Sequence, residues 1–196
     1  LMIGIWKIAP ALACGCTLVV KPAELTPMTA IRIGELALEA GIPPGVLNIM
    51  TGKGSVVGDA MVAHPQIDKI TFTGSPKVGR GIMQGAAVNF KKITLELGGK
   101  SANIIFDDAD LDSAVRGSAS GIFFNAGQVC SAGSRILVHK KIHDEVVDRL
   151  IERAKDIRIG DTASDDTIMG PLVSRNQIAI GSGWNFARGE KCPVAP

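Results

Sequence analysis

Residues 69–99 read KITFTGSPKVGRGIMQGAAVNFKKITLELGG, and this stretch decides the fold. Residues 69–73 and 92–96 are rich in β-branched side chains, which predicts two short strands. Between them, Ser75 followed by Pro76 is typical of a helix N-cap with proline in the first turn, and it predicts a helix to about Ala87. A strand, a helix and a second strand joined by short turns predict a right-handed βαβ unit with parallel strands.

The same alternation continues in both directions along the sequence. Upstream, we predict strands at residues 17–21 and 47–50 and helices at residues 26–40 and 55–63. Thr26 is the predicted N-cap of the first of these helices, with Pro27 in its first turn. Downstream of Gly98-Gly99, we predict strands at residues 102–106 and 135–139, helices at residues 111–124 and 142–157, and a polar loop at residues 160–166. One face of the last helix is expected to be buried, because four apolar residues recur there at every fourth position: Ile142, Val146, Leu150 and Ala154.

These elements predict an α/β protein with two domains. Residues 1–98 form a Rossmann-like doubly wound parallel sheet, and residues 99–177 form the start of a second α/β domain, with the boundary at the double glycine. Residues 178–196 show no periodicity and are expected to be a divergent tail of unknown structure.

Composition excludes several classes of function. With 46% hydrophobic and 20% charged residues, the chain of 196 residues is expected to be a soluble globular protein. The net charge of +2 comes from interspersed charges, so we expect no nucleic acid as partner. No apolar run is long enough to span a bilayer and no secretory signal is visible, so we expect no membrane and a cytoplasmic location.

The cysteines and histidines give no sign of a metal site. The four cysteines contain no C-x-x-C pair and form no spaced cluster with the three histidines, so we expect neither zinc nor a disulfide. Cys14 and Cys16 lie in an apolar segment, which favours an interpretation as small core side chains.

Two segments of the first domain are candidates for binding a nucleotide. At Gly74 and Ser75, a strand end turns into a helix whose unpaired N–H groups suit a pyrophosphate, although an ordinary turn has the same pattern. Lys21 and Glu24 follow a predicted strand, at the edge of a parallel sheet where ligands bind. They suit ribose hydroxyls or phosphate oxygens, but a solvated surface pair is the simpler interpretation of these two residues alone.

Two further residues are candidates for catalysis. Glu96 lies between Leu95 and Leu97 at the end of a predicted strand, where burial would raise its pKa toward that of a general base; the alternative is a rim glutamate that faces water. Cys130 lies in a small polar loop rich in glycine, where a thiolate could attack a carbonyl carbon, although a lone cysteine is more often inert.

Taken together and in this order, these segments resemble the NAD(P)-dependent aldehyde dehydrogenase superfamily from about Trp6 to Gln177. The supporting stretches are Pro10-Ala-Leu-Ala13, Glu39-Ala-Gly-Ile-Pro-Pro-Gly45, Phe72-Thr-Gly-Ser75, Leu95-Glu-Leu-Gly-Gly-Lys-Ser101 and Asp108-Ala-Asp-Leu-Asp112. The resemblance implies a partial coenzyme-binding domain at residues 1–98 and the opening part of the catalytic domain at residues 99–177.

The resemblance implies oxidation of an aldehyde to a carboxylic acid with NAD(P)+. Cys130 would attack the aldehyde and carry a thiohemiacetal and then a thioester, with its backbone N–H helping to hold the oxyanion, and Glu96 would act as the base. The cofactor-binding residues would be Lys21 and Glu24 at the adenosine ribose, Gly74 and Ser75 at the pyrophosphate, and Leu97 and Gly98 at the nicotinamide amide. Because a carboxylate repels a 2′-phosphate, Glu24 favours NAD, with NADP possible. The presence of Glu96 favours hydrolysis over transfer of the acyl group to coenzyme A. The parent enzyme is expected to be a homo-oligomer.

The sequence also departs from the family pattern. An asparagine of the oxyanion hole and an E-x-F-G-P-like motif are expected outside this chain, and the pattern is lost near Gln177, for which a break in the coding frame is one hypothesis. We therefore expect the 196-residue chain by itself to be inactive, and the alternative function is a truncated nucleotide-binding module without turnover. A redox sensor centred on Cys130 is disfavoured, because no resolving cysteine lies near it in sequence. Trp6 and Phe124 either line the substrate pocket or belong to the core, and the sequence does not say which aldehyde is used.

Overall fold

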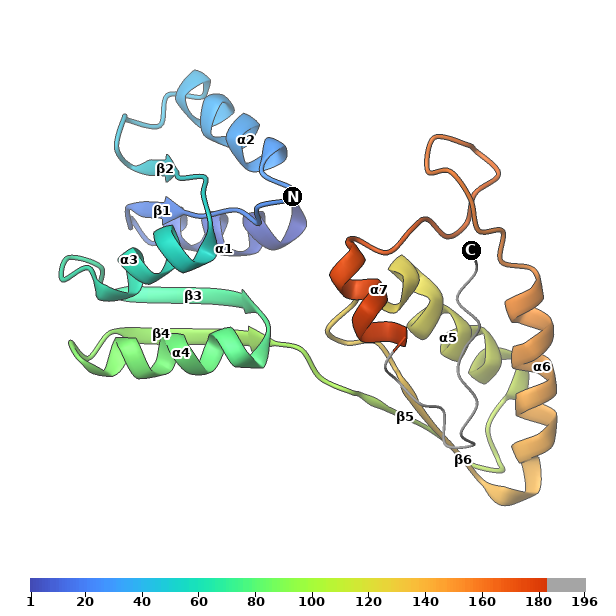
Figure 1. The fold of residues 1–196 in the computed structure, drawn as a ribbon. Helices are drawn as coiled ribbons and strands as arrows, with labels where there is room; N and C mark the ends of the chain where they lie inside the picture. Colours follow the sequence, from blue (N-terminus) through green and yellow to red (C-terminus); the bar gives the residue numbers. More distant parts are fainter. Residues whose placement is uncertain (183–196) are drawn as a thin grey trace. The chain divides into compact units, whose positions relative to one another are not determined.

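The computed structural model describes residues 1–182 and shows an α/β protein that divides into two compact units. The first unit comprises Leu1–Leu97 and the second begins at Gly98, so the division falls at the double glycine (Figure 1). Residues 183–196, with Cys192 and most of the predicted tail, lie outside the described part. The roles assigned to the two domains stay a prediction.

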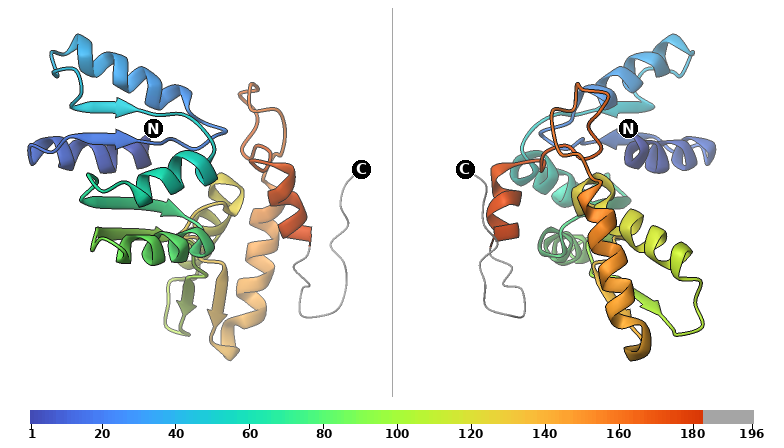
Figure 2. Two further views of the ribbon diagram at one scale, coloured as in Figure 1. Left: turned by 60° about the vertical axis from the view of Figure 1, so that its left-hand side comes forward. Right: turned by 90° about the vertical axis from the view of Figure 1, so that its right-hand side faces the viewer.

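The first unit consists of two parallel βαβ units in succession. Its elements are α1 (Met2–Ala13), β1 (Leu18–Val20), α2 (Met28–Glu39), β2 (Leu47–Ile49), the π-helical turn η1 (Gly54–Gly58), α3 (Asp59–Ala63), β3 (Lys69–Gly74), α4 (Pro76–Ala87) and β4 (Lys92–Leu97). Strand β1 pairs with β2 and β3 pairs with β4, both in parallel. In Figures 1 and 2 the four strands follow one another in the order β2, β1, β3, β4.

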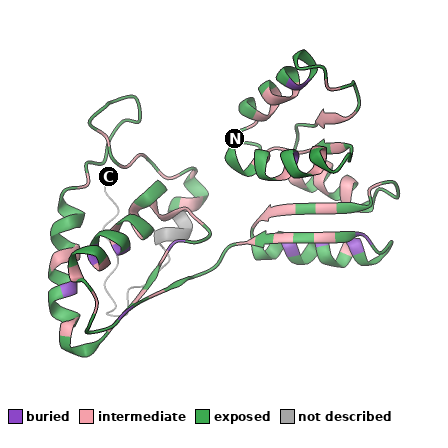
Figure 3. Ribbon diagram, turned by 180° about the vertical axis from the view of Figure 1, so that it is seen from behind, coloured by how far each residue is buried: buried purple, intermediate pink, exposed green. Residues whose placement is uncertain are grey.

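Helix α4 covers one face of the β3–β4 pair, and α1 approaches the other. On one face, α1 approaches closely enough for the Lys7 ammonium to donate to the Thr71 hydroxyl at 3.4 Å. On the other face, α4 buries Gly79, and a Cβ at this position would come within 2.8 Å of the Leu97 side chain, so glycine allows the close approach. Figure 3 shows the buried positions of α4. The α/β class and its parallel strands confirm the predicted fold, although the hydrogen-bonded ladders form separate two-stranded sheets.

The helix starts agree with the sequence at α4 and differ at α2. Ser75 caps α4 as predicted, because its hydroxyl accepts from the Val78 N–H at 3.3 Å. At α2, the predicted threonine cap is wrong: Pro27 occupies the N-cap position, the helix begins at Met28, and no side chain caps it. The Thr26 N–H instead closes a turn onto the Ala23 carbonyl at 3.2 Å, which moves the helix start one residue along the chain.

The second unit contains a third parallel βαβ unit. Its elements are β5 (Ala102–Ile105), α5 (Leu111–Phe123), the 3-10 turn η2 (Phe124–Gly127), β6 (Arg135–Val138), the 3-10 turn η3 (Lys140–Ile142), α6 (His143–Lys155) and α7 (Arg175–Ser182). Strands β5 and β6 are parallel, and a core of Ile105, Val115 and Val146 joins the sheet to α5 and α6. Residues 178–182, predicted as part of an aperiodic tail, continue α7.

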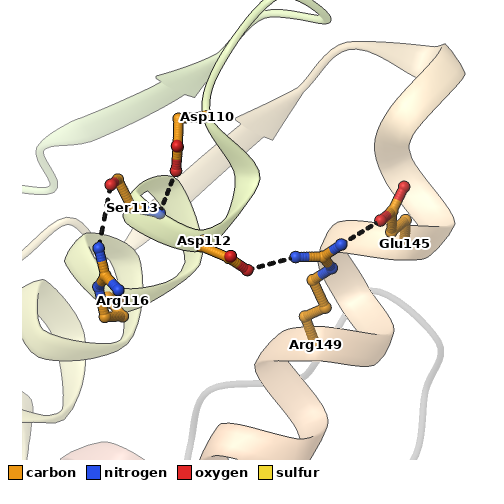
Figure 4. Close-up of polar contacts among 6 residues, drawn as sticks. All are labelled: Asp110, Asp112, Ser113, Arg116, Glu145 and Arg149. Atoms are coloured by element: carbon orange, nitrogen blue, oxygen red, sulfur yellow. Dashed lines mark hydrogen bonds and ion pairs between the residues drawn. The ribbon is translucent and has the colours of Figure 1, made fainter.

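Polar contacts reinforce the α5–α6 packing. The Arg149 guanidinium on α6 binds Asp112 on α5 at 2.6 Å and Glu145, one turn earlier on its own helix, at 2.5 Å (Figure 4). Asp110 caps α5 by accepting from the Ser113 N–H at 2.7 Å, and this hydrogen bond holds the pKa of the Asp110 carboxyl below its usual range.

Some expectations about burial are wrong. Of the four predicted positions, Ile142 on η3 and Val146 and Leu150 on α6 contribute to the core, but Ala154 is exposed. Cys14 and Cys16 are exposed rather than buried, since they lie in the turn that follows α1, a helix not predicted from the sequence. Trp6 and Phe124 are also exposed and belong to no core among residues 1–182.

Candidate active site

A small pocket lies at the carboxyl ends of β1 and β2 in the first unit. The loops that follow the two strands line it together with Pro27, at the start of α2; the lining residues are Pro22, Ala23, Glu24, Pro27, Thr51, Gly52 and Lys53. A parallel sheet binds ligands at this edge, because the loops after its strands diverge there.

Lys21 and Glu24, both predicted for this site, tie the two loops together. The Lys21 ammonium donates to the Pro22 carbonyl at 2.7 Å and to the Gly52 carbonyl at 3.3 Å. A carboxylate oxygen of Glu24 accepts from the Gly54 N–H at 2.8 Å. The pair is therefore more than a solvated surface pair: it fixes the shape of the pocket, and Glu24 also lines it.

Gly74 and Ser75 lie where β3 passes into α4. A Cβ at Gly74 would overlap the ring of Phe72, so the structure gives this glycine an intramolecular reason besides the predicted approach of a ligand. The Ser75 hydroxyl is used as the helix cap. The positive end of the α4 dipole lies at this turn, next to the carboxyl end of β3, as the sequence analysis expected.

Glu96 is exposed, so of the two alternatives left open by the sequence the structure favours a rim glutamate that faces water. Strand alternation explains this: Leu95 and Leu97 are half-buried on the face that α4 covers, so Glu96 points to the opposite face. It lies in register with Thr73, and Leu97 with Gly74, which brings these four residues together at one strand edge.

The sequence analysis missed Lys7, which lies on the same face as Glu96. Burial lowers the pKa of the Lys7 ammonium, and the negative charge of Glu96 partly offsets this shift. The signal was hidden because α1, which brings this lysine to β3, was not predicted.

Cys130 lies in the second unit on the cysteine loop, residues 128–134, which joins η2 to β6. The thiol is exposed and forms no disulfide. Within residues 1–182, the Cys130 backbone N–H makes no hydrogen bond, so it is available to a ligand. Gly98 and Gly99 belong to the same unit, and a Cβ at Gly99 would lie 3.9 Å from the Cys130 carbonyl oxygen, whereas one at Gly98 would meet nothing within 4 Å.

The structure thus brings Lys21 and Glu24 to the same loop at residues 52–54, Gly74 to Leu97, and Gly99 to Cys130. Glu96 and Cys130 belong to different units, and their convergence stays a prediction. Among residues 1–182, no three His, Cys, Asp or Glu side chains gather as a metal site. No helix in this part of the chain is long and apolar enough to cross a membrane.

Successive parallel βαβ units, with a pocket at the carboxyl edge of the strands, define a Rossmann-like α/β protein. The chain belongs to the aldehyde dehydrogenase family, whose sequence model matches residues 1–184. This confirms the predicted family, and the match extends past both limits set from the sequence, Trp6 and Gln177.

Named relatives bear out the assignment. Retinal dehydrogenase 2 of Homo sapiens is 53% identical over 178 residues, which cover 90% of this chain and 34% of that protein. Phenylacetaldehyde dehydrogenase of Pseudomonas fluorescens is 51% identical over 175 residues, which cover 89% of this chain and 35% of that protein. The crystal structure of a betaine aldehyde dehydrogenase double mutant from Staphylococcus aureus in complex with NAD+ has a TM-score of 0.86 at 53% identity, covering 88% of this chain and 34% of that one. The chain spans about a third of the length of these proteins.

Proposed function

We propose that this chain is part of an NAD+-dependent enzyme that oxidises an aldehyde to a carboxylic acid. The observation that carries the proposal is the exposed Cys130 thiol, whose own N–H remains free, in a chain that belongs to the aldehyde dehydrogenase family. The named relatives act on aldehydes as different as retinal and phenylacetaldehyde, so the proposal extends to the aldehyde class and not to one substrate.

The residues of the first unit fit a dinucleotide. The pocket beside Glu24 offers a carboxylate to ribose hydroxyls, and the amides at the start of α4 suit a pyrophosphate. When bound, the nicotinamide supplies a two-electron acceptor for hydride. The backbone at Leu97 and Gly98 is proposed to hold its amide, since a Cβ at Gly98 would meet no neighbour within 4 Å.

Glu24 favours NAD over NADP in this proposal. Its carboxylate lines the pocket, and a 2′-phosphate placed there would face a like charge. Lys53 lines the same pocket, and its ammonium makes no hydrogen bond or ion pair among residues 1–182. Its positive charge reduces the repulsion, so NADP is expected to bind more weakly than NAD rather than be excluded.

Cys130 is the proposed nucleophile. Its thiolate sulfur adds to the aldehyde carbon, and the carbonyl π electrons move to oxygen to give a thiohemiacetal anion. The free Cys130 N–H can donate to that oxygen and stabilise its charge. Loss of hydride from this carbon leaves a thioester on Cys130.

Glu96 is the proposed base for the second half of the reaction. Its carboxylate takes a proton from water as the water oxygen attacks the thioester carbon, and the C–S bond breaks to release the acid and the thiolate. Exposure of Glu96 in the first unit leaves the carboxylate accessible to water. The coenzyme and catalytic roles of the two units, a homo-oligomeric parent enzyme and a cytoplasmic location belong to the same proposal.

Thermal unfolding and thiol labelling of the 196-residue chain test the proposal together. We expect NAD+ to raise the melting temperature, as a ligand of the folded state must. We also expect iodoacetamide to alkylate Cys130 faster than Cys14 and Cys16, although all three thiols are exposed to solvent. A raised melting temperature without selective labelling favours the alternative, a nucleotide-binding module without turnover. Failure of both measurements would refute the proposed function.

A further inference from the structure

The backbone that leads into the cysteine loop is strained. Asn125 and Ala126 have φ values of 51° and 54°, and Gly127 continues in the left-handed region with a φ of 72°. Side chains disfavour this conformation, so a non-glycine residue adopts it only where its surroundings impose it. Two such residues in succession, four and five positions before Cys130, require contacts that hold them.

Gln128 supplies those contacts with the donor of its side-chain amide and with its backbone N–H and carbonyl groups. The Nε2 group donates to the Asn125 carbonyl at 3.3 Å, and the Asn125 Nδ2 group donates back to the Gln128 carbonyl at 3.2 Å. The Gln128 backbone N–H also donates to the Asn125 carbonyl, at 3.1 Å. Three hydrogen bonds thus close the strained turn upon itself.

The other end of the same amide reaches a distant part of the second unit. The Gln128 Oε1 atom accepts from the Val173 N–H at 3.0 Å, across 45 residues of sequence. Val173 directly precedes Ser174, whose hydroxyl accepts from the Gln177 N–H at 3.2 Å at the start of α7. The cysteine loop is therefore anchored both to its own turn and to the segment that leads into α7.

We propose that Gln128 is a positioning residue for Cys130: its side chain clamps the left-handed turn to the Val173 amide and so fixes the loop that presents the thiol and the free N–H. This inference rests on the proposed function, because it concerns how the nucleophile is held. Few other side chains can replace glutamine here, since the clamp needs one donor and one acceptor on a chain long enough to reach two partners. The hydrogen bonds fall on residues 125, 128 and 173 and leave the Cys130 N–H uncommitted.

The test compares two variants. Gln128→Met removes the donor and the acceptor of the side-chain amide, whereas Gln128→Asn keeps both on a shorter side chain. Gln84→Met is the matched control, since Gln84 is exposed on α4 and its side chain makes no hydrogen bond in the described chain. The readouts are the iodoacetamide rate of Cys130 relative to Cys14 at one pH, measured well below the melting temperature, and amide hydrogen exchange at Val173.

We expect Gln128→Met to lower the Cys130 to Cys14 rate ratio by about two- to tenfold, the equivalent of one net hydrogen bond. Amide exchange at Val173 should rise, and Gln84→Met should change neither the rate ratio nor the exchange. The rate ratio of Gln128→Asn should fall between those of Gln128→Met and the unaltered chain. If Gln128→Met fails to fold, the result for Gln128→Asn tests the inference by itself.

Two results would overturn the inference, and only the second would also contradict the proposed function. An unchanged rate ratio in a folded Gln128 variant, when the unaltered chain labels Cys130 selectively, removes the positioning role and leaves the proposed function intact. Equal labelling of Cys130 and Cys14 in the unaltered chain removes the proposed nucleophile and the positioning role with it.

Discussion

Val146 and Val147 are adjacent on α6 and offer a matched test of the second unit's core. Val146 is 0% exposed and packs with Ile105 and Val115, whereas Val147 is 37% exposed. Changing either valine to alanine removes the same atoms and gives the same small gain in helix propensity. The difference between the two variants therefore isolates the burial of Val146.

We expect Val146→Ala to reduce the free energy of unfolding by about 2 to 3 kcal/mol. Two buried carbons account for about 1.6 kcal/mol at about 0.8 each, and the cavity left behind adds the rest. For a unit of this size, the melting temperature should fall by about 10 to 20 °C. Val147→Ala should cost less than about 0.5 kcal/mol, as surface changes usually do.

Urea unfolding followed by circular dichroism measures the loss, and hydrogen exchange assigns it to α5 and α6. If the two variants unfold within about 0.5 kcal/mol of each other, Val146 is not enclosed and the described core is wrong. Unequal denaturant slopes would show instead that a change in the unfolded state contributes.

Three further predictions follow from single contacts. Glu24→Gln keeps an acceptor for the Gly54 N–H but loses the charge, so the affinity for NADP+ relative to NAD+ should rise by about fivefold in calorimetric titrations. Lys91 is buried and donates to the His64 and Ile67 carbonyls, so Lys91→Met should cost about 2 kcal/mol or more in urea unfolding. The pKa of Asp110 is lowered, so its charge stabilises the folded state above the ordinary carboxyl pKa of about 4. This stabilisation is lost as the pH falls toward the lower pKa of the folded state. The melting temperatures of the unaltered protein and Asp110→Asn should therefore differ at pH 7 and converge near pH 3.

Each of these has a result that would contradict it. An unchanged preference for NAD+ in Glu24→Gln would mean that the carboxylate does not face the 2′ position. A neutral Lys91→Met variant would mean that water replaces the ammonium at the two carbonyls. If the melting temperatures of the unaltered protein and Asp110→Asn still differ near pH 3, the shape of the Asp110 side chain rather than its charge makes it a good cap.

The chemistry of the candidate site was predictable residue by residue, but its environment was not. The sequence of Ser75 followed by Pro76 predicted that Ser75 is a helix cap, and the structure confirms it. The same kind of signal failed at Thr26, where a turn onto Ala23 moved the helix start. Flanking leucines suggested a buried Glu96, yet alternation along β4 turns this side chain to the opposite face from its neighbours.

The sequence by itself determined the alternation of strands and helices, the family and the identity of the candidate residues, because β-branched runs, caps and glycine turns act over a few positions. Only the tertiary structure showed that Lys7 lies beside Glu96, that Glu24 holds Gly54, and that Gln128 reaches Val173. These contacts join residues 30 to 89 positions apart, and hydrogen bonds at such separations depend on how helices pack against strands rather than on any local pattern.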